Sequence, residues 1–350
     1  MPRLIDIARL AAALALSTSA IPIGVNGAAA EDAPAFYKGK TVRFVVGAGV
    51  GGGFDTYARM LAPHLAKALG ATVIVENQPG AGGIIALNAI AAAQPDGLRI
   101  MLVNGTPLLL GQILETKNVR YDMTKLSHLG AISNEPWAAT LRTDLPIKSP
   151  QDLVKYGKQI RWGATGPIGG PSDGAALTCE ALKIDCRIIA GYRGSSDIAL
   201  AMQRGEIDGL YITDGSAARY RQRKQVRVIG IGARERSKLM PDVPTFHEAV
   251  KLSPKSQWWL DVRAELNDFG RVLVTTQGVP ADRLAFLRAA IKKVLTDPAV
   301  LAEAEKRKRE LEYRGPEVLS KLATKLIKGI DAKQKAAMRE VVLKKYYGKQ

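Results

Sequence analysis

The segment TVRFVVGAGVGGGFDTYARMLAPHLAKALGATVIVENQPGAGG, residues 41–83, decides the fold of this chain. Its pattern predicts a buried strand at 41–46, a glycine-rich turn, a helix over 56–69, a strand at 71–77 and a second glycine-rich turn. Two such turns in one strand–helix–strand unit place many backbone N–H groups at the carboxyl ends of parallel strands. Open α/β sheets bind their ligands at that edge.

A similar order recurs between residues 159 and 232. Predicted strands alternate there with short helices, and most of the strands end in a turn rich in glycine or hydroxyl residues. We therefore expect two α/β lobes, each a mainly parallel sheet flanked by helices, whose loops face a central cleft. The expected boundaries place residues 31–137 and 265–350 in a discontinuous first lobe and residues 138–264 in the second.

Residues 1–30 have the pattern of a secretory signal peptide. A weakly basic start precedes a short apolar core at 10–16, and Ala28–Ala30 offers a small-residue cleavage site before Glu31. A membrane anchor is the alternative, but the polar, Gly and Pro residues after the core make a poor spanning helix. The sequence therefore predicts a periplasmic protein. It lacks a twin-arginine pair, so we expect it to cross the membrane unfolded, without a bound nucleotide.

The chain of 350 residues is basic, with a formal net charge of +17. Length alone suggests two domains. The basic residues concentrate at 219–238 and in the C-terminal third, which raises the possibility of nucleic-acid binding. Against it, the charges at 306–309 are spaced among glutamates as on a solvated helix face. The 219–238 segment also lacks the aromatic pattern that base stacking needs. We expect no nucleic-acid partner, and steering of anionic solutes is one role left for the charge.

Cys179 and Cys186 are the only cysteines, and the chain has three histidines. In an oxidising compartment the two cysteines form either one local disulfide or two buried free thiols, and their spacing leaves both alternatives open. It does not fit a zinc motif. The common nucleophile, phosphate-loop and metalloprotease motifs are missing too, so we expect no metal, no cofactor and no enzymatic activity.

A nucleotide-binding interpretation competes for the first turn. Gly47, Gly49 and Gly52 fit G-x-G-x-x-G, and Glu76 lies at about the distance of a ribose-binding acid, as in a Rossmann-type NAD(P)-dependent oxidoreductase. We expect Asp55 to be the N-cap of the following helix. A carboxylate at that helix end competes with a pyrophosphate.

Several motifs resemble those of the Bug family, the periplasmic receptors of tripartite tricarboxylate transporters. They are GGxxD at Gly52, Gly53 and Asp55, VEN-x-PGAGG at residues 75–83, a G-x-x-G-G-P-S loop at residues 166–172 and PDVPT at residues 241–245. The resemblance covers nearly all of residues 38–330. It implies a type II periplasmic binding protein fold and a monomeric receptor that captures a small organic anion, expected to be a carboxylate. The receptor's partner would be the membrane subunits of a transporter or, alternatively, a sensor kinase.

Four features depart from the family pattern and leave the identity of the solute open. The first turn begins with Gly47, where the family usually has proline or phenylalanine. Phe54 stands where a small residue or threonine is common, and Asp173 stands where the second loop often has histidine. Residues 253–269 replace a segment that is usually rich in glycine.

The expected ligand contacts follow from backbone chemistry. Turns before helices present N–H groups and the positive end of the helix dipole to an anion. Arg193 is expected either to clamp a carboxylate or to form a surface ion pair. The hinge between the lobes is expected at residues 132–143 and 263–276. The candidate ligand-binding residues are Gly51, Gly52, Gly53, Phe54, Asp55, Asn104 and Thr106 in the first lobe, and Thr165, Gly169, Gly170, Ser172, Arg193, Ser195 and Asp214 in the second.

Export can be tested directly. The mature protein should begin near Glu31 and should be released by osmotic shock, because cleavage at the small-residue site removes residues 1–30. N-terminal sequencing of the shock fluid checks this. An intact N-terminus in the cytosolic fraction would contradict it.

Overall fold

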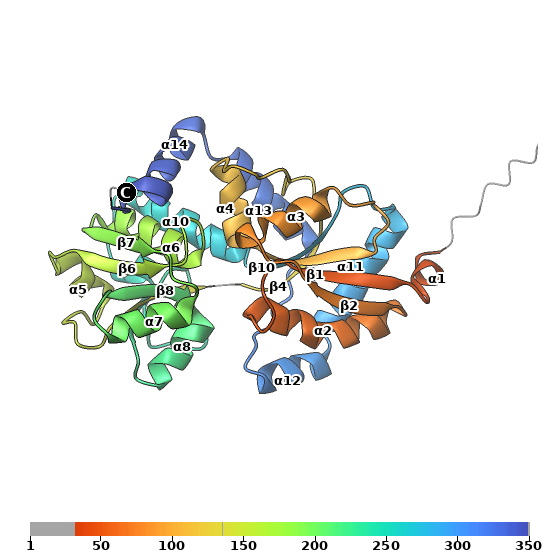
Figure 1. The fold of residues 1–350 in the computed structure, drawn as a ribbon, viewed down its shortest axis with the longest axis horizontal. Coiled ribbons are helices and arrows are strands. Elements are labelled where there is room, and N and C mark those ends of the chain that lie inside the picture. The colour runs from red at the N-terminus through yellow and green to blue at the C-terminus, as the bar shows by residue number, and fades with distance from the viewer. Residues whose placement is uncertain (1–31, 135, 349–350) are drawn as a thin grey trace, which may run out of the picture. The chain divides into compact units, whose positions relative to one another are not determined.

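The computed structural model describes residues 32–134 and 136–348, so the predicted signal peptide lies outside the described part. Two five-stranded sheets organise the described residues (Figure 1). The first has the order β2-β1-β3-β10-β4 and the second β7-β6-β8-β5-β9. The strands of the first sheet are β1 (Thr41–Val46), β2 (Thr72–Asn77), β3 (Arg99–Asn104), β4 (Ser127–Ser133) and β10 (Arg271–Thr275). Those of the second are β5 (Trp137–Leu141), β6 (Ile160–Ala164), β7 (Cys186–Ala190), β8 (Gly209–Thr213) and β9 (Arg227–Ile231).

Each sheet contains one strand that runs against its neighbours. β10 is antiparallel to β3 and β4, and β5 is antiparallel to β8 and β9. Both are the first strands that the chain forms after it crosses from the other sheet, so they enter from the edge at which the parallel strands end. The expected α/β class with two mainly parallel sheets is confirmed.

Helices cover the faces of both sheets (Figure 1). Around the first sheet lie α2 (Gly53–Leu69), α3 (Ile84–Ala91), α4 (Gly105–Ile113), α11 (Ala281–Leu295), α12 (Pro298–Lys306) and α13 (Pro316–Lys328), with the short α1 (Ala33–Tyr37) against α11. Around the second lie α5 (Pro150–Lys155), α6 (Gly170–Leu182), α7 (Ser195–Gln203), α8 (Asp214–Gln222), α9 (Phe246–Ala249) and α10 (Pro254–Asp268). The chain then ends in α14 (Ala332–Glu340) and a π-helix (Val341–Lys345).

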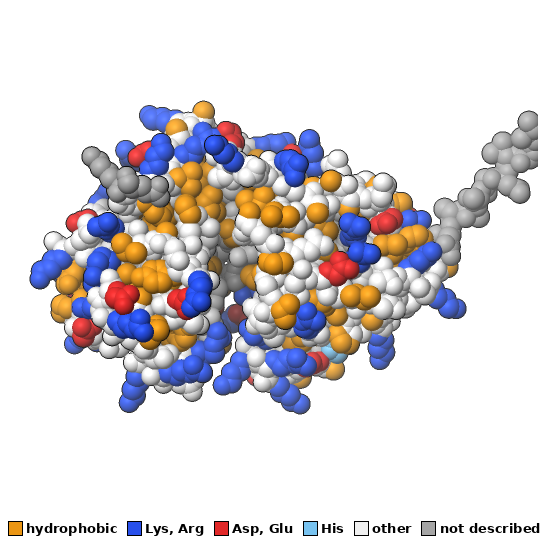
Figure 2. Space-filling model, in the orientation of Figure 1, with side chains coloured by type: hydrophobic (Ala, Val, Ile, Leu, Met, Phe, Trp, Pro, Cys, Tyr) orange, Lys and Arg blue, Asp and Glu red, His pale blue; other side chains and the backbone are white. Residues whose placement is uncertain are grey.

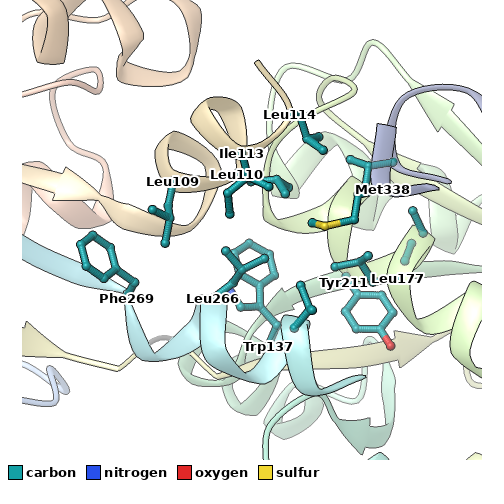
Figure 3. Packing of buried hydrophobic residues seen from close by; sticks show 14 of the residues in the cluster. Leu109, Leu110, Ile113, Leu114, Trp137, Leu177, Tyr211, Leu266, Phe269 and Met338 are labelled. Atoms are coloured by element: carbon teal, nitrogen blue, oxygen red, sulfur yellow. The ribbon is translucent and has the colours of Figure 1, made fainter. Parts of the chain in front are cut away.

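One hydrophobic core joins the two sheets through α4 and α10. Figure 3 shows Leu110 and Ile113 of α4 near Leu266 of α10, with Trp137 of β5 beside them. The hydroxyl of Thr106, at the start of α4, donates to the carbonyl of Leu266 over 2.8 Å inside this core. Burial of this apolar surface stabilises the contact between α4 and α10.

The C-terminal segment packs where we did not expect it. Residues 265–350 were assigned to the first lobe, but the π-helix lies against α6 of the second. Lys345 pairs with Glu180 at 2.5 Å, and the Tyr346 hydroxyl donates to the same carboxylate at 2.8 Å. Trp137, also placed in the first lobe, begins strand β5 of the second sheet. These contacts join segments far apart in sequence, so local pattern could not have assigned them.

Cys179 and Cys186 form a disulfide and are not two buried free thiols. It joins α6 to β7 across a short loop. Within residues 32–134 and 136–348, no cluster of His, Cys, Asp and Glu could hold a metal ion. The same described residues include no helix with the length and apolar character needed to cross a bilayer.

His128 of β4 makes the stability of the fold sensitive to pH. Its side chain is 2 % exposed and its ring lies edge-on to Phe269, with centroids 5.6 Å apart. Burial, and to a lesser extent the Arg288 guanidinium, lowers the pKa of His128 to about 4. The folded protein therefore disfavours the protonated ring, and this group's contribution to stability is lost as pH falls below 6.5.

We expect His128→Gln to remove this dependence. Between pH 6.5 and about 4, His128 should cost wild-type protein up to about 3 kcal/mol of unfolding free energy. Urea unfolding of both proteins across this range measures the difference in slope. Equal acid-side losses in the two proteins would contradict the assignment.

Candidate functional site

A cavity of about 590 Å³ lies between the two lobes, at the carboxyl ends of β1, β3, β6 and β8. This volume falls in the range of about 300–1,000 Å³ typical of small-molecule sites. Nine of the candidate residues line it: Gly51, Gly53, Phe54, Asn104, Thr165, Gly169, Gly170, Ser195 and Asp214. Both halves of the chain therefore contribute to one cavity.

The helices that start at this cavity have no side-chain caps. For α2, α4, α6, α7 and α8, the first residue or the N-cap lines the cavity, and none of these N-caps accepts a side-chain hydrogen bond. By contrast, Ser149, Ser253 and Asp297 cap α5, α10 and α12 away from it. The first N–H groups of a helix have no partner within the helix. At α4 the Gly105 N–H already donates to the Gly270 carbonyl, and at α8 the Gly215 N–H donates to the Asp214 carboxylate. The cavity thus collects backbone donors from the starts of α2, α6 and α7, and positive helix ends from both lobes.

Asp55 does not cap α2, and the prediction that it does is wrong. The helix begins at Gly53 with Gly52 as N-cap, so Asp55 lies inside the first turn. Its buried carboxylate accepts from the Gly51 N–H at 2.8 Å and from Arg59 Nε at 2.9 Å. Arg59 first, then the Gly51 N–H, lower the pKa of Asp55 against the effect of burial. Asp55 therefore shapes the glycine turn, and it occupies the Gly51 donor.

Four other candidates do not line the cavity. The Arg193 side chain is 91 % exposed and pairs with Asp197 at 2.9 Å, so the surface ion pair is the alternative the structure has. Thr106 donates to the core carbonyl of Leu266, and the hydroxyl of Ser172 donates to the carbonyl of Gly169 at 2.8 Å. Gly52 is the N-cap of α2 and is not part of the cavity lining.

The cavity is also lined by four basic residues that the sequence patterns did not identify as site residues: Arg219, Arg271, Lys308 and Arg309. Lys308 and Arg309 were interpreted as part of a solvated helix face, which is wrong because α12 ends at Lys306. The left-handed backbone of Lys308 (φ 54°) helps to turn the chain back toward the cavity. The glutamate-rich spacing of this segment carried no signal of that turn. Arg271 opens a strand whose register sets it beside Asn104, which only pairing of the strands reveals.

Tyr57, in the second turn of α2, organises these cations. Its ring centroid lies 4.7 Å from the Arg271 guanidinium and 5.5 Å from that of Arg309. Its hydroxyl donates to the carbonyl of Glu310 at 2.9 Å. Such cation–π contacts favour a cation over the face of the ring. Tyr57 therefore holds the segment that follows α12 against the start of α2.

Two acids share the cavity wall. Burial raises the pKa of Asp214, although hydrogen bonds from Ser237 and from the Gly215 N–H oppose this. Burial also raises the pKa of Glu310, and the nearby Asp214 raises it further. The two carboxyls are thus less readily ionised than free ones, and the cavity keeps an excess of positive charge.

The second-lobe wall rests on a buried ion pair. Arg263 of α10 and Asp173 of α6 are both fully buried, 3.9 Å apart, and the guanidinium lies over the Trp137 ring at 5.3 Å. Burial raises the pKa of Asp173, with Arg263 acting in the opposite direction. A Cβ on Gly170 would meet the Trp137 ring at 1.7 Å. The start of α6 is therefore fitted against Trp137, whose ring also lies against the Arg263 guanidinium.

The sequence and the fold of this chain are similar to those of known proteins. Residues 57–328 match the model of the tripartite tricarboxylate transporter family receptor. A UPF0065 protein of Bordetella bronchiseptica is 28% identical over 296 residues, which cover 83% of this chain and 82% of the relative. MatC of Rhodopseudomonas palustris, solved with bound malate, is 24% identical at a TM-score of 0.65 and covers 87% of this chain and 99% of its own. Rpa4515 of the same organism, solved with adipate, is 16% identical at a TM-score of 0.67, covering 87% and 97%.

A matched pair of glycine substitutions tests the wall. Gly170→Ala should lower the unfolding free energy by about 1–3 kcal/mol, because the new methyl group must displace Trp137. Gly166→Ala, in the same loop, meets nothing within 4 Å and should change stability by less than about 0.5 kcal/mol. Chemical denaturation of both variants measures this. Equal stabilities would show that Trp137 moves aside freely.

Proposed function

Because this chain belongs to the family of tripartite tricarboxylate transporter receptors, we propose that it captures a small organic carboxylate between its lobes and delivers it to a membrane transporter of that type. The family consists of periplasmic solute-binding receptors and not of enzymes, so the Rossmann-type oxidoreductase interpretation is wrong. We place this chain in the periplasm after removal of residues 1–30.

One observation carries the proposal: the starts of α2, α6 and α7, which have no side-chain caps, converge on one cavity from both lobes. Backbone N–H groups at a helix start bind anions well, since the donors are fixed and the helix dipole favours negative charge. The N–H groups of Gly53 and Phe54 would hold a carboxylate from the first lobe. The N–H of Gly170 and the hydroxyls of Thr165 and Ser195 would hold it from the second.

Known ligands of similar proteins agree with this chemistry. The similar structures MatC and Rpa4515 were solved with malate and with adipate, and both of these ligands are carboxylates. A ligand that touches both lobes at once favours the conformation in which they approach, as in hinged binding proteins. We propose that the segments 132–143 and 263–276 provide this hinge.

A ligand screen tests the proposal. Mature protein is heated with mono-, di- and tricarboxylates, aromatic acids and NAD, each in turn. A true ligand at about a hundred times its dissociation constant should add about 2.7 kcal/mol to the unfolding free energy. Stabilisation by NAD and by no acid would contradict the proposed function.

Two glycines of the first turn provide a matched pair of variants. Neither a Cβ on Gly53 nor one on Gly49 meets anything within 4 Å, but Gly53 lines the cavity and Gly49 does not. Gly53→Val should weaken binding of the acid found in the screen by about tenfold or more, because the side chain blocks charge-assisted hydrogen bonds. Gly49→Val should bind as wild type does. Calorimetry ranks the two, and equal affinities would show that the anion is not held at this turn.

A further inference from the structure

Three cations meet at the edge of the cavity from opposite lobes. Arg219 comes from α8 of the second lobe, and Lys308 and Arg309 come from the segment that follows α12 of the first. In Figure 2, Lys and Arg side chains gather at the lower ends of both lobes, over α8 and α12. The same three residues also line a neighbouring cavity of about 480 Å³, whose wall includes Leu239 and Leu301.

These cations lack the acidic partners that neighbouring cations have. Outside the cavity, Arg307 pairs with Glu303 at 2.6 Å and Lys238 pairs with Glu312 at 2.8 Å. Within the described ranges, Arg219 makes one hydrogen bond, to the hydroxyl of Ser216, and neither Lys308 nor Arg309 forms an ion pair. Arg219, Lys308 and Arg309 therefore have no acidic partner in the described part of the chain, whereas Arg307 and Lys238 near them do.

Holding these charges together costs free energy. Burial lowers the pKa of Arg309, and the nearby guanidiniums of Arg219 and Arg271 lower it further. Like charges brought together in a partly buried place repel one another more strongly than in water. The Nε of Arg309 is buried and has no hydrogen-bond partner in the described part of the chain. An anion at this place would supply the missing partner and relieve the repulsion.

The position of the cluster is built into the fold. The Tyr57 hydroxyl holds the Glu310 carbonyl, and its ring lies against Arg309. Tyr57 is one helical turn beyond Gly53, where the first anionic group is proposed to bind. One turn of α-helix is about 5.4 Å, so the two places are separated by a span that a short ligand can bridge. Ile212 and Leu239 line the same cavity and offer apolar contact.

We propose that Arg219, Lys308 and Arg309 form a second anion subsite, and that the solute is a dianion whose acidic groups are separated by an apolar chain. This inference rests on the proposed function, because the first acidic group binds at the glycine turns. The distal group touches cations from both lobes, so it bridges the lobes as the first group does. A monoanion leaves the cluster unneutralised.

Matched acids test the inference on the mature protein. The probes are straight-chain α,ω-dicarboxylates of about four to ten carbons, each paired with the monocarboxylate of equal length. Calorimetry at constant ionic strength gives both affinities. At the best length, the dicarboxylate should bind about tenfold or more tightly than its monocarboxylate, because charge-assisted hydrogen bonds to the distal group are added.

Variants assign the difference to the cluster. The double variant Arg219→Gln with Arg309→Gln, and the single variant Lys308→Gln at an exposed position, should reduce the preference for the dicarboxylate. The double variant should bring it close to one. Lys306→Gln, an exposed cation that does not line the cavity, is the matched control and should keep the wild-type preference. Monocarboxylate binding by each variant shows that its fold and its first subsite are intact.

The possible outcomes separate the two proposals. If monocarboxylates bind and dicarboxylates bind no better at any length, the second subsite is overturned and the proposed function stands. If the preference survives in the double variant, or the control loses it equally, the cluster is not the subsite. If no acid of either series binds, both the inference and the proposed function are overturned. If the double variant loses monocarboxylate binding as well, only the inference is overturned.

Discussion

The structure depends on backbone N–H groups that no side chain caps. Five helices begin at the central cavity with uncapped starts, although the chain caps α5, α10 and α12 elsewhere with serine and aspartate. Unpaired donors are costly when they are buried, so they belong where a ligand or water reaches them. The glycine turns keep them reachable, because a residue without a Cβ leaves the space above the donor open. Asp55 supports this arrangement from behind by holding the Gly51 N–H.

The second lobe maintains its part of the cavity through packing. The Trp137 ring fills the space that a side chain at position 170 would need, and the Arg263 guanidinium lies over that ring. Asp173 and Arg263 come from two helices, α6 and α10. They meet as a fully buried pair, and removing one partner of such a pair leaves an uncompensated charge at a cost of about 3–5 kcal/mol. This contact therefore couples α6, whose first residue lines the cavity, to α10.

The cavity carries more basic than acidic side chains. Its cations come from α8, from the start of β10 and from the segment after α12, so no single region of the sequence carries them. Tyr57 links two of them to the first glycine turn, and the raised pKa values of Asp214 and Glu310 limit the opposing negative charge. Many of the chain's other basic residues lie elsewhere, and several of them form surface ion pairs, as Arg221, Arg236 and Arg307 do.

The sequence by itself determined the local units. The strand predicted at 41–46 has those bounds in the structure, and the strand predicted at 71–77 begins one residue later, at Thr72. The glycine turns lie at strand ends, because apolar runs and glycines act over a few residues. The family motifs added the two-lobed fold. Tertiary structure alone decided the direction of β5 and β10, the packing of the C-terminal segment on α6, the pairing of Asp173 with Arg263 and the entry of Lys308 and Arg309 into the cavity. Each of these joins residues far apart in the chain, and their spacing in sequence carries no information about contacts that only folding creates.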